Sequence, residues 1–376
     1  MKRFSALLFA LLILALTACG VNQVSPTAPA SSSPEPEPGR RVTVQFDTRT
    51  ETVKNDDGVT LLTYSYPQAS VDVSDSESGS AIEDTINSTL TPSQDTLDQL
   101  SQAAAAEYAG LDETQRESWT GYGLYYNAEV MRGDSRILSL YWTVSQMSGG
   151  SHPNNGGFGL SFDVETGERL TASSLGNEGG NLSSVVSRFV LSSISSNENI
   201  DTFYGISDFI ENVLNTEQWY LSDSGLTVFA NEGEIAPRAV GAMVFTMPYS
   251  DLQNSLSEKY APVNASPLGS AGALDISSGT GGANVSAILD SGGVEFSLTT
   301  SEDITGLCIN RVSMDSGGDW FATGQVLYVS YMDAGESLGL TAAFMDNPLY
   351  SVTYGLSSAQ LIGDSGEDGS LLLLDP

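Results

Sequence analysis

The segment that decides the fold runs from Leu138 to Leu175 and reads LSLYWTVSQMSGGSHPNNGGFGLSFDVETGERLTASSL. The loop in its middle, Ser148–Gly157, holds four glycines, one proline and the only histidine of the chain. On both sides of this loop, apolar side chains occupy every second position: Leu138, Leu140, Trp142 and Val144 before it, and Phe158, Leu160 and Phe162 after it. A period of two is typical of half-buried strands. The segment therefore predicts a hairpin of two strands.

A tight turn is predicted directly after this hairpin. Asp163–Glu168 reads DVETGE, and Gly167 is free to take the positive φ angle that such a turn needs. Elsewhere in the chain, apolar residues recur at the i, i+3, i+4 and i+7 spacing of amphipathic helices. The predicted helices are residues 81–109, 182–194 and 203–214, and further strands are predicted within 41–73, 117–132, 219–229 and 242–248.

The C-terminal part of the chain has a different composition. Residues 263–284 are rich in Gly, Ser and Ala and lack periodic apolar positions, so we interpret them as a linker that ends a domain over residues 41–262. Beyond the linker, short strand-like runs recur at a spacing of about ten residues. Residues 285–376 are therefore predicted to form a small all-β, sandwich-like domain.

The N-terminus has the pattern of a secretory signal. Residues 1–18 begin with Lys2 and Arg3 and continue with an apolar run that is too short for a membrane span of about 20 residues. The sequence LTAC that ends at Cys19 resembles the lipobox of bacterial lipoproteins. This resemblance implies cleavage before Cys19 and a diacylglyceryl anchor on its sulfur, with the protein on the outer face of the membrane. The alternative is an ordinary secreted protein with a chance cysteine.

The residues after Cys19 cannot build a core. Residues 19–40 are rich in Ser and Pro and have almost no large apolar side chains, which predicts a disordered tether. If Cys19 is lipidated, Cys308 has no second cysteine in the chain to pair with. Cys308 lies in an apolar strand-like run, where it is expected to act as a small buried hydrophobic residue.

Charge limits the classes of partner. The chain has 47 acidic and 14 basic residues, a formal net charge of −33. Nucleic acid is an unfavourable partner because its phosphates would be repelled. A cationic partner or divalent cations would be attracted. The acidic surface could also serve only solubility.

No catalytic constellation stands out in the sequence. His152 is adjacent to Ser151, and neighbours in sequence do not face each other as a catalytic triad requires. One histidine and one remaining cysteine do not make an ordinary zinc site. We therefore assign no catalytic residue, no metal ligand and no cofactor. A pair of carboxylates in a glycosidase cleft stays possible in principle, but nothing in the sequence selects a pair.

Two blocks of sequence resemble a known extracellular family. The first is the hairpin with GGSH at 149–152 followed by FDVETGERL at 162–170. The second is WYL at 219–221, then GL at 225–226 and EIAPRAVG at 234–241. Over residues 42–255, the chain is similar to the extracellular domain of the lysozyme-responsive anti-sigma factor of the sigma-V system. It is also similar to the non-catalytic N-terminal module of a peptidoglycan deacetylase.

The resemblance implies an α+β fold with helices packed on an antiparallel sheet. Arg238 departs from the family pattern, which usually has an aromatic residue there. Control of a sigma factor and deacetylation are not carried over, because they belong to other parts of those proteins. The C-terminal all-β part lies outside the resemblance.

The leading hypothesis is a surface-anchored, non-enzymatic binding lipoprotein that recognises an extracellular protein such as lysozyme, or cell-wall glycan. The alternative is a cell-wall carbohydrate hydrolase or esterase. The candidate binding residues lie in the hairpin and its loop: Tyr141, Gly149, Gly150, His152, Asn154, Asn155 and Phe158.

Replacing Cys19 by Ala should prevent lipidation and release or mislocalise the protein. The reason is that the proposed acyl chains are attached through the sulfur of this residue. Detergent partitioning of cell fractions measures the effect. A Cys19→Ala protein that still partitions with membranes would contradict the lipobox interpretation.

Overall fold

The computed structural model describes residues 39–150, 152–177, 180–196, 202–252, 254–262, 274–314, 316, 320–342, 350–354 and 357–361. The predicted signal peptide, Cys19 and nearly all of the tether lie outside this range, so they stay predictions. None of the helices in the described ranges is long and apolar enough to cross a membrane.

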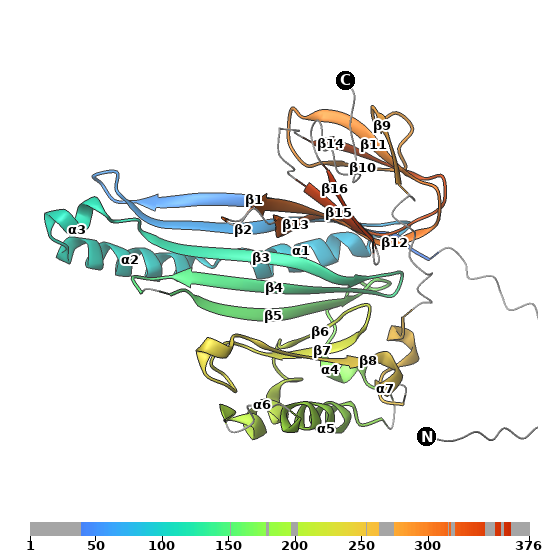
Figure 1. Cartoon of the computed structure of the whole chain (residues 1–376), viewed down its shortest axis with the longest axis horizontal. Coiled ribbons are helices and arrows are strands. Elements are labelled where there is room, and N and C mark those ends of the chain that lie inside the picture. Colours follow the sequence, from blue (N-terminus) through green and yellow to red (C-terminus); the bar gives the residue numbers. More distant parts are fainter. Residues whose placement is uncertain are drawn as a thin grey trace, which may run out of the picture. The chain divides into compact units, whose positions relative to one another are not determined.

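The described strands form one large sheet and two smaller ones (Figure 1). The large sheet has the order β16-β15-β12-β13-β1-β2-β3-β4-β5. Its strands are β1 (Val42–Lys54), β2 (Thr60–Val73), β3 (Tyr122–Gly133), β4 (Ile137–Met147), β5 (Asn154–Asp163), β12 (Ile304–Met314), β13 (Trp320–Met332), β15 (Tyr350–Tyr354) and β16 (Ser357–Leu361). Neighbouring strands are antiparallel, except that β2 and β3 are parallel. The α+β class with an antiparallel sheet and packed helices is confirmed.

Two helices cover one face of this sheet. They are α1 (Ser78–Leu90) and α2 (Gln94–Gly110), and a short α3 (Glu113–Glu117) follows. Ile82, Ile86 and Leu90 lie four residues apart on α1, and their side chains are buried against the sheet. In the hairpin β4–β5, the alternating apolar residues predicted from the sequence, such as Leu138 and Leu140, are buried in the same core.

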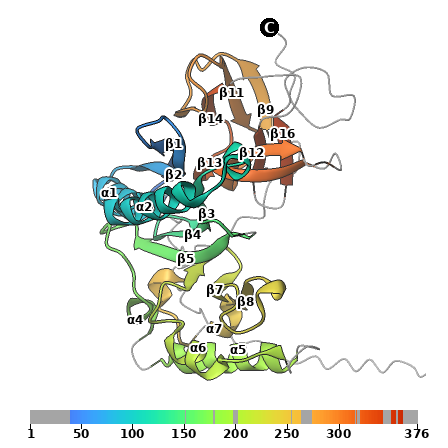
Figure 2. The same cartoon turned by 90° about the vertical axis from the view of Figure 1, so that its left-hand side faces the viewer.

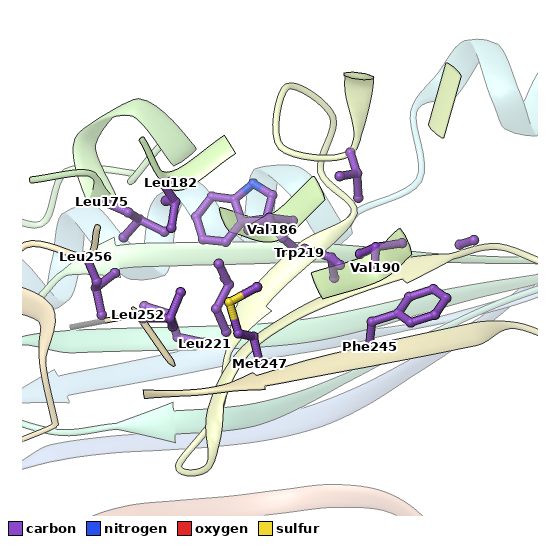
Figure 3. Packing of buried hydrophobic residues seen from close by; sticks show 14 of the residues in the cluster. Leu175, Leu182, Val186, Val190, Trp219, Leu221, Phe245, Met247, Leu252 and Leu256 are labelled. Carbon is purple, nitrogen blue, oxygen red and sulfur yellow. The ribbon is translucent and has the colours of Figure 1, made fainter. Parts of the chain in front are cut away.

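A second layer packs on the opposite face of β4 and β5 (Figure 2). It consists of a three-stranded sheet, β6-β7-β8, with α4 (Ala172–Leu175), α5 (Leu182–Ser195), α6 (Ile206–Asn212) and α7 (Tyr249–Leu252). The strands are β6 (Trp219–Leu221), β7 (Gly225–Ala230) and β8 (Met243–Pro248), and Arg238–Val240 and Glu258–Tyr260 are short 3₁₀ helices. Side chains of these strands alternate between two faces. Trp219, Leu221, Phe245 and Met247 pack with Val186 and Val190 of α5 (Figure 3). Tyr220 and Phe229 point toward β4 instead.

The loop of the central hairpin is shorter than the sequence predicted. Strand β5 begins at Asn154, so Gly156 and Gly157 are strand residues. Their neighbourhood explains why glycine is needed in this strand. A Cβ on Gly157 would lie 2.3 Å from the Tyr141 hydroxyl, and one on Gly159 would lie 1.6 Å from the Trp219 carbonyl oxygen. Gly157 leaves room for the Tyr141 side chain of the neighbouring strand β4, and Gly159 allows the second layer to approach the sheet closely.

Asp163 fixes the turn that follows β5. Its Oδ1 accepts hydrogen bonds from the backbone N–H groups of Glu165 (2.9 Å) and Thr166 (3.1 Å). Its Oδ2 lies 2.5 Å from Lys259 Nζ and accepts a hydrogen bond from the Tyr260 hydroxyl. Gly167 has a φ of 75°, as predicted. Burial alone would raise the pKa of Asp163, but Lys259, the Thr166 amide and the Tyr260 hydroxyl together lower it.

The C-terminal region forms a β-sandwich. A four-stranded sheet, β10-β14-β11-β9, packs its apolar face on β12, β13 and β15. Its strands are β9 (Leu274–Ser278), β10 (Val285–Ile288), β11 (Val294–Thr300) and β14 (Ser337–Ala342). The predicted all-β, sandwich-like architecture of this region is confirmed.

Two observations bear on the predicted boundary at 263–284. Strand β9 lies inside this segment, and residues 263–273 are outside the described residues. Strand β13 pairs with β1, so that Thr43 lies opposite Val329 and Gln45 opposite Leu327. One sheet therefore joins the two regions through backbone hydrogen bonds, and independent folding of residues 285–376 stays a prediction.

Replacing Gly159 by Ala should destabilise the fold, because its Cβ would overlap the Trp219 carbonyl group. Overpacking of this kind typically costs about 1–3 kcal/mol. Gly150→Ala is the matched control, since the nearest atom to its Cβ would be 3.6 Å away. Urea unfolding midpoints compare the two variants. Equal midpoints would contradict the close approach of the two layers.

Replacing Asp163 by Asn should remove a pH-dependent part of the stability. The folded-state pKa of Asp163 lies below its unfolded value of about 3.9. The carboxylate therefore stabilises the fold above that pH, and this contribution is lost as the pH falls through the folded-state pKa. In urea unfolding, the wild type should have a larger free energy of unfolding than Asp163→Asn at about pH 5. This difference should shrink as the pH falls to about 2. Asp57→Asn, in an exposed turn, is the control. If the difference in free energy of unfolding between the wild type and Asp163→Asn did not change with pH, the proposed role of the Asp163 carboxylate would be wrong.

Candidate binding groove beside strand β5

The predicted binding residues do not form one cluster. Gly149, Gly150 and His152 are exposed at the tip of the β4–β5 hairpin, and Gly149 adjoins Glu107 of α2. Tyr141 is half-buried on the opposite side from the helices, between β4 and the second layer. Its ring centroid lies 5.3 Å from that of Tyr220 and 5.1 Å from that of Phe229. Tyr141 therefore packs the two layers together.

Three other predicted residues lie beside one groove. Phe158 lines it and stacks on Trp142, with ring centroids 4.5 Å apart. Asn155 Nδ2 donates a hydrogen bond to Glu232 Oε1 (3.2 Å). Asn154 Oδ1 accepts one from Arg238 Nη2 (2.9 Å). The start of β5 is thus attached to a turn that lies about 80 residues later in the sequence.

This feature, the β5-edge groove, has a volume of about 470 Å³. The residues that line it come from β5 and from two turns of the second layer: Phe158, Thr216, Glu217, Gln218, Asn231, Glu232, Gly233 and Glu234. Three of these are glutamates. The groove is therefore acidic, with an aromatic ring in its wall.

The edge of β5 is covered by groups that line the groove. The side chain of Asn231 accepts a hydrogen bond from Gly157 N (2.6 Å) and donates one to Gly157 O (3.4 Å), as a neighbouring strand would. Gly159 N donates to the carbonyl oxygen of Glu217. Covered in this way, the edge strand is protected from pairing with another chain.

The three glutamates differ in their partners. Glu217 forms an exposed ion pair with Arg169. Glu234 accepts hydrogen bonds from the Gln218 side chain and from Asn231 N (2.8 Å), and Glu232 accepts from Asn155. Among the residues that the structure describes, Glu232 and Glu234 form no ion pair and are held by uncharged donors. Fixed carboxylates beside an aromatic ring suit a cationic group.

The sequence did not single out most of these groove residues. The signal that could have found them is the acidic run NEGE at 231–234, in which Gly233 has a φ of 77°. Arg238, noted as a departure from the family pattern, packs over Gly233 and donates to Asn154.

Glu129 marks a separate polar cluster. It lies opposite Tyr141 in the register of β3 and β4. Burial raises the pKa of the Glu129 carboxyl, and burial likewise raises the pKa values of Tyr141 and Tyr220. Within the described ranges, no group of three or more His, Cys, Asp or Glu side chains is arranged to hold a metal ion.

Comparison with known proteins gives two family matches. Residues 53–155 match the family described as Deacetylase PdaC, and residues 179–250 match the family described as Protein of unknown function (DUF3298). No curated protein matches the chain. Apart from Phe158, the lining of the groove lies within residues 179–250, and Asn155, at the end of the other matched segment, donates a hydrogen bond to Glu232.

Two solved structures of the DUF3298 family are similar to the chain. One, from Bacteroides fragilis NCTC 9343, is 17% identical, with a TM-score of 0.40; the match covers 57% of this chain and 94% of that one. The other, from Pseudomonas aeruginosa PAO1, is 12% identical, with a TM-score of 0.39, and covers 59% and 97%. The two family matches indicate an extracellular module of the cell envelope.

Proposed function

We propose that the chain is a surface-anchored, non-enzymatic binding lipoprotein whose β5-edge groove recognises a basic extracellular protein, with lysozyme as the first candidate. The observation that carries this proposal is the pair Glu232 and Glu234, held beside Phe158 by uncharged hydrogen-bond donors. An arginine or lysine side chain of the partner would enter between the carboxylates and lie against the ring.

Long-range charge supports the same kind of partner. The net charge of −33 would speed the encounter with a basic protein, mainly at low ionic strength. Specific affinity needs a buried anchor as well. Phe158 is only half-buried and is held in place by its stacking on Trp142, so it can fill this role without a large loss of side-chain entropy.

The resemblance to the extracellular domain of a lysozyme-responsive anti-sigma factor favours lysozyme among basic proteins. The alternative, a cell-wall hydrolase or esterase, would be supported by paired carboxylates with shifted pKa values. Glu129 has a raised pKa, but it faces Tyr141 and Tyr220, whose pKa values it also raises. This arrangement suits packing between two layers better than acid–base chemistry.

Lysozyme binding by residues 39–376 should be measurable by calorimetry at about 50 mM salt and should weaken at about 300 mM, because exposed charges are screened. The double variant Glu232→Gln/Glu234→Gln should bind about tenfold more weakly or worse, since hydrogen bonds to charged groups are lost. Glu113→Gln/Glu117→Gln, on the exposed α3, is the charge-matched control and should bind like the wild type.

Three outcomes would contradict this proposal. Equal weakening in the α3 control, or equal binding of another protein with a similar positive charge, would leave only non-specific charge attraction. No binding of lysozyme at low salt would remove lysozyme as the partner.

A further inference from the structure

A second and larger groove lies between β1 and the C-terminal sandwich. Its volume is about 1030 Å³, at the upper end of the range usual for ligand pockets. It is lined by β1, by β10 with the turn that follows it, and by Arg311 of β12. We call it the β1–β10 groove. None of its lining residues is shared with the β5-edge groove.

The floor of this groove is a polar row on β1. Val44 and Phe46 point into the core under α1, so Gln45, Asp47 and Arg49 share the other face of the strand. Gln45 lies opposite Leu327, whose side chain is in the core of the sandwich. The face that the sandwich covers at one end of β1 therefore continues as the open polar row.

A hydrogen bond fixes the wall of the groove relative to this floor. Gln45 Nε2 donates to the carbonyl oxygen of Ile288, the last residue of β10, at 2.8 Å. The Ile288 side chain itself is 59% exposed and lines the groove. One exposed apolar side chain is thus set among polar groups, a combination that suits the mixed faces of a sugar ring.

The far wall is a network of charged and hydroxyl groups. Arg311 Nη2 lies 3.3 Å from Asp290 Oδ1, and the Tyr350 hydroxyl donates to Asp290 Oδ2. The Arg311 guanidinium also lies 5.3 Å from the centroid of the Tyr350 ring. Stacking and the ion pair hold this guanidinium in place, and the Arg311 side chain, which is 46% exposed, lines the groove.

Arg49 supplies a second guanidinium. Its Nε donates to Gln68 Oε1 at 2.8 Å, so the hydrogen bond engages one of its five donors. The whole chain has only 14 basic residues against 47 acidic ones, yet two arginines line this one groove, beside the two aspartates Asp47 and Asp290. In so acidic a protein, a local pair of guanidinium groups offers the means to hold an anion against the general charge.

The rest of the lining argues for a saccharide over a protein. Serine and threonine residues of β1, β2, β10 and β14 line the groove together with the two arginines. Protein interfaces usually depend on large apolar or aromatic anchors in desolvated pockets. Here, closely spaced donors and acceptors match a hydroxyl-rich ligand.

We propose that the β1–β10 groove binds a saccharide that carries carboxylate groups, with Arg49 and Arg311 donating hydrogen bonds to the carboxylates and the hydroxyl side chains binding the sugar hydroxyls. The site is independent of the β5-edge groove, and its ligand has the opposite charge.

The test uses the full chain and a tetramer of galacturonic acid as the probe, at about 50 mM salt, with calorimetric detection. The methyl-esterified tetramer is the matched ligand, because it keeps the same sugar rings and linkages but has uncharged methyl esters in place of the carboxylates. The acidic tetramer should bind and the ester should bind at least tenfold more weakly. Arg49→Gln and Arg311→Gln should each weaken binding about tenfold or more, because each substitution removes a hydrogen bond between charged groups.

Arg116→Gln is the matched protein control. Arg116 is exposed on α3, and its removal changes the net charge equally without touching the groove. Arg49→Gln removes an exposed side chain and should fold normally, so the test does not depend on the Arg311 network. Glu232→Gln/Glu234→Gln should bind the tetramer like the wild type.

Four results would overturn the proposal. The first two are that the acidic tetramer does not bind, or that the ester binds as tightly as the acidic tetramer. The other two are that Arg116→Gln weakens binding as much as the groove variants do, or that a glycerol phosphate polymer binds more tightly than the tetramer. The last result would assign the groove to a phosphate-bearing polymer.

Discussion

A buried guanidinium, that of Arg132, attaches one end of the second layer to the sheet. Only 1% of this residue is exposed, and a buried charge is tolerated when its hydrogen-bond donors are occupied. Arg132 pairs with Asp134 and donates to the Tyr249 hydroxyl (2.7 Å) and the Tyr260 carbonyl (2.9 Å). Its partners thus come from the β3–β4 hairpin and from the segment that follows β8. The turn at 231–234, and with it the β5-edge groove, is held separately by hydrogen bonds to Asn155 and Gly157 of β5.

Features with a local cause could be predicted from the sequence. The alternation at Leu138 and Leu140 indicates which face of β4 is buried. The Asp163–Gly167 turn is specified by its own residues, through the Asp163 carboxylate and the positive φ of Gly167. Gly157 and Gly159 were harder to interpret. Their requirement for glycine comes from Tyr141 and from the Trp219 carbonyl, so no neighbour in the sequence reveals it. A glycine-rich run beside a strand therefore indicated a loop where the chain continues as a strand.

The candidate sites were predicted only in part, for the same reason. Phe158, Asn154 and Asn155 were selected from the hairpin, but the groove beside them is completed by Glu217 and by residues 231–234. The side chain of Asn231 replaces a neighbouring strand along β5, and this kind of pairing has no periodic signal. The β1–β13 pairing has none either, because it joins strands separated by nearly the whole chain. The sequence alone therefore does not show that the polar row on β1 borders a groove.

The two grooves place opposite demands on one charge distribution. A cationic partner of the β5-edge groove is favoured by the net charge at long range and by Glu232 and Glu234 at contact, so added salt weakens both effects. An anionic saccharide is repelled at long range and attracted only near Arg49 and Arg311. Salt then screens the repulsion beyond about 8–10 Å more than the short-range contacts. The affinity for the saccharide should consequently depend on salt much less steeply than the affinity for the cationic partner. This difference distinguishes binding at Arg49 and Arg311 from attraction by the overall charge.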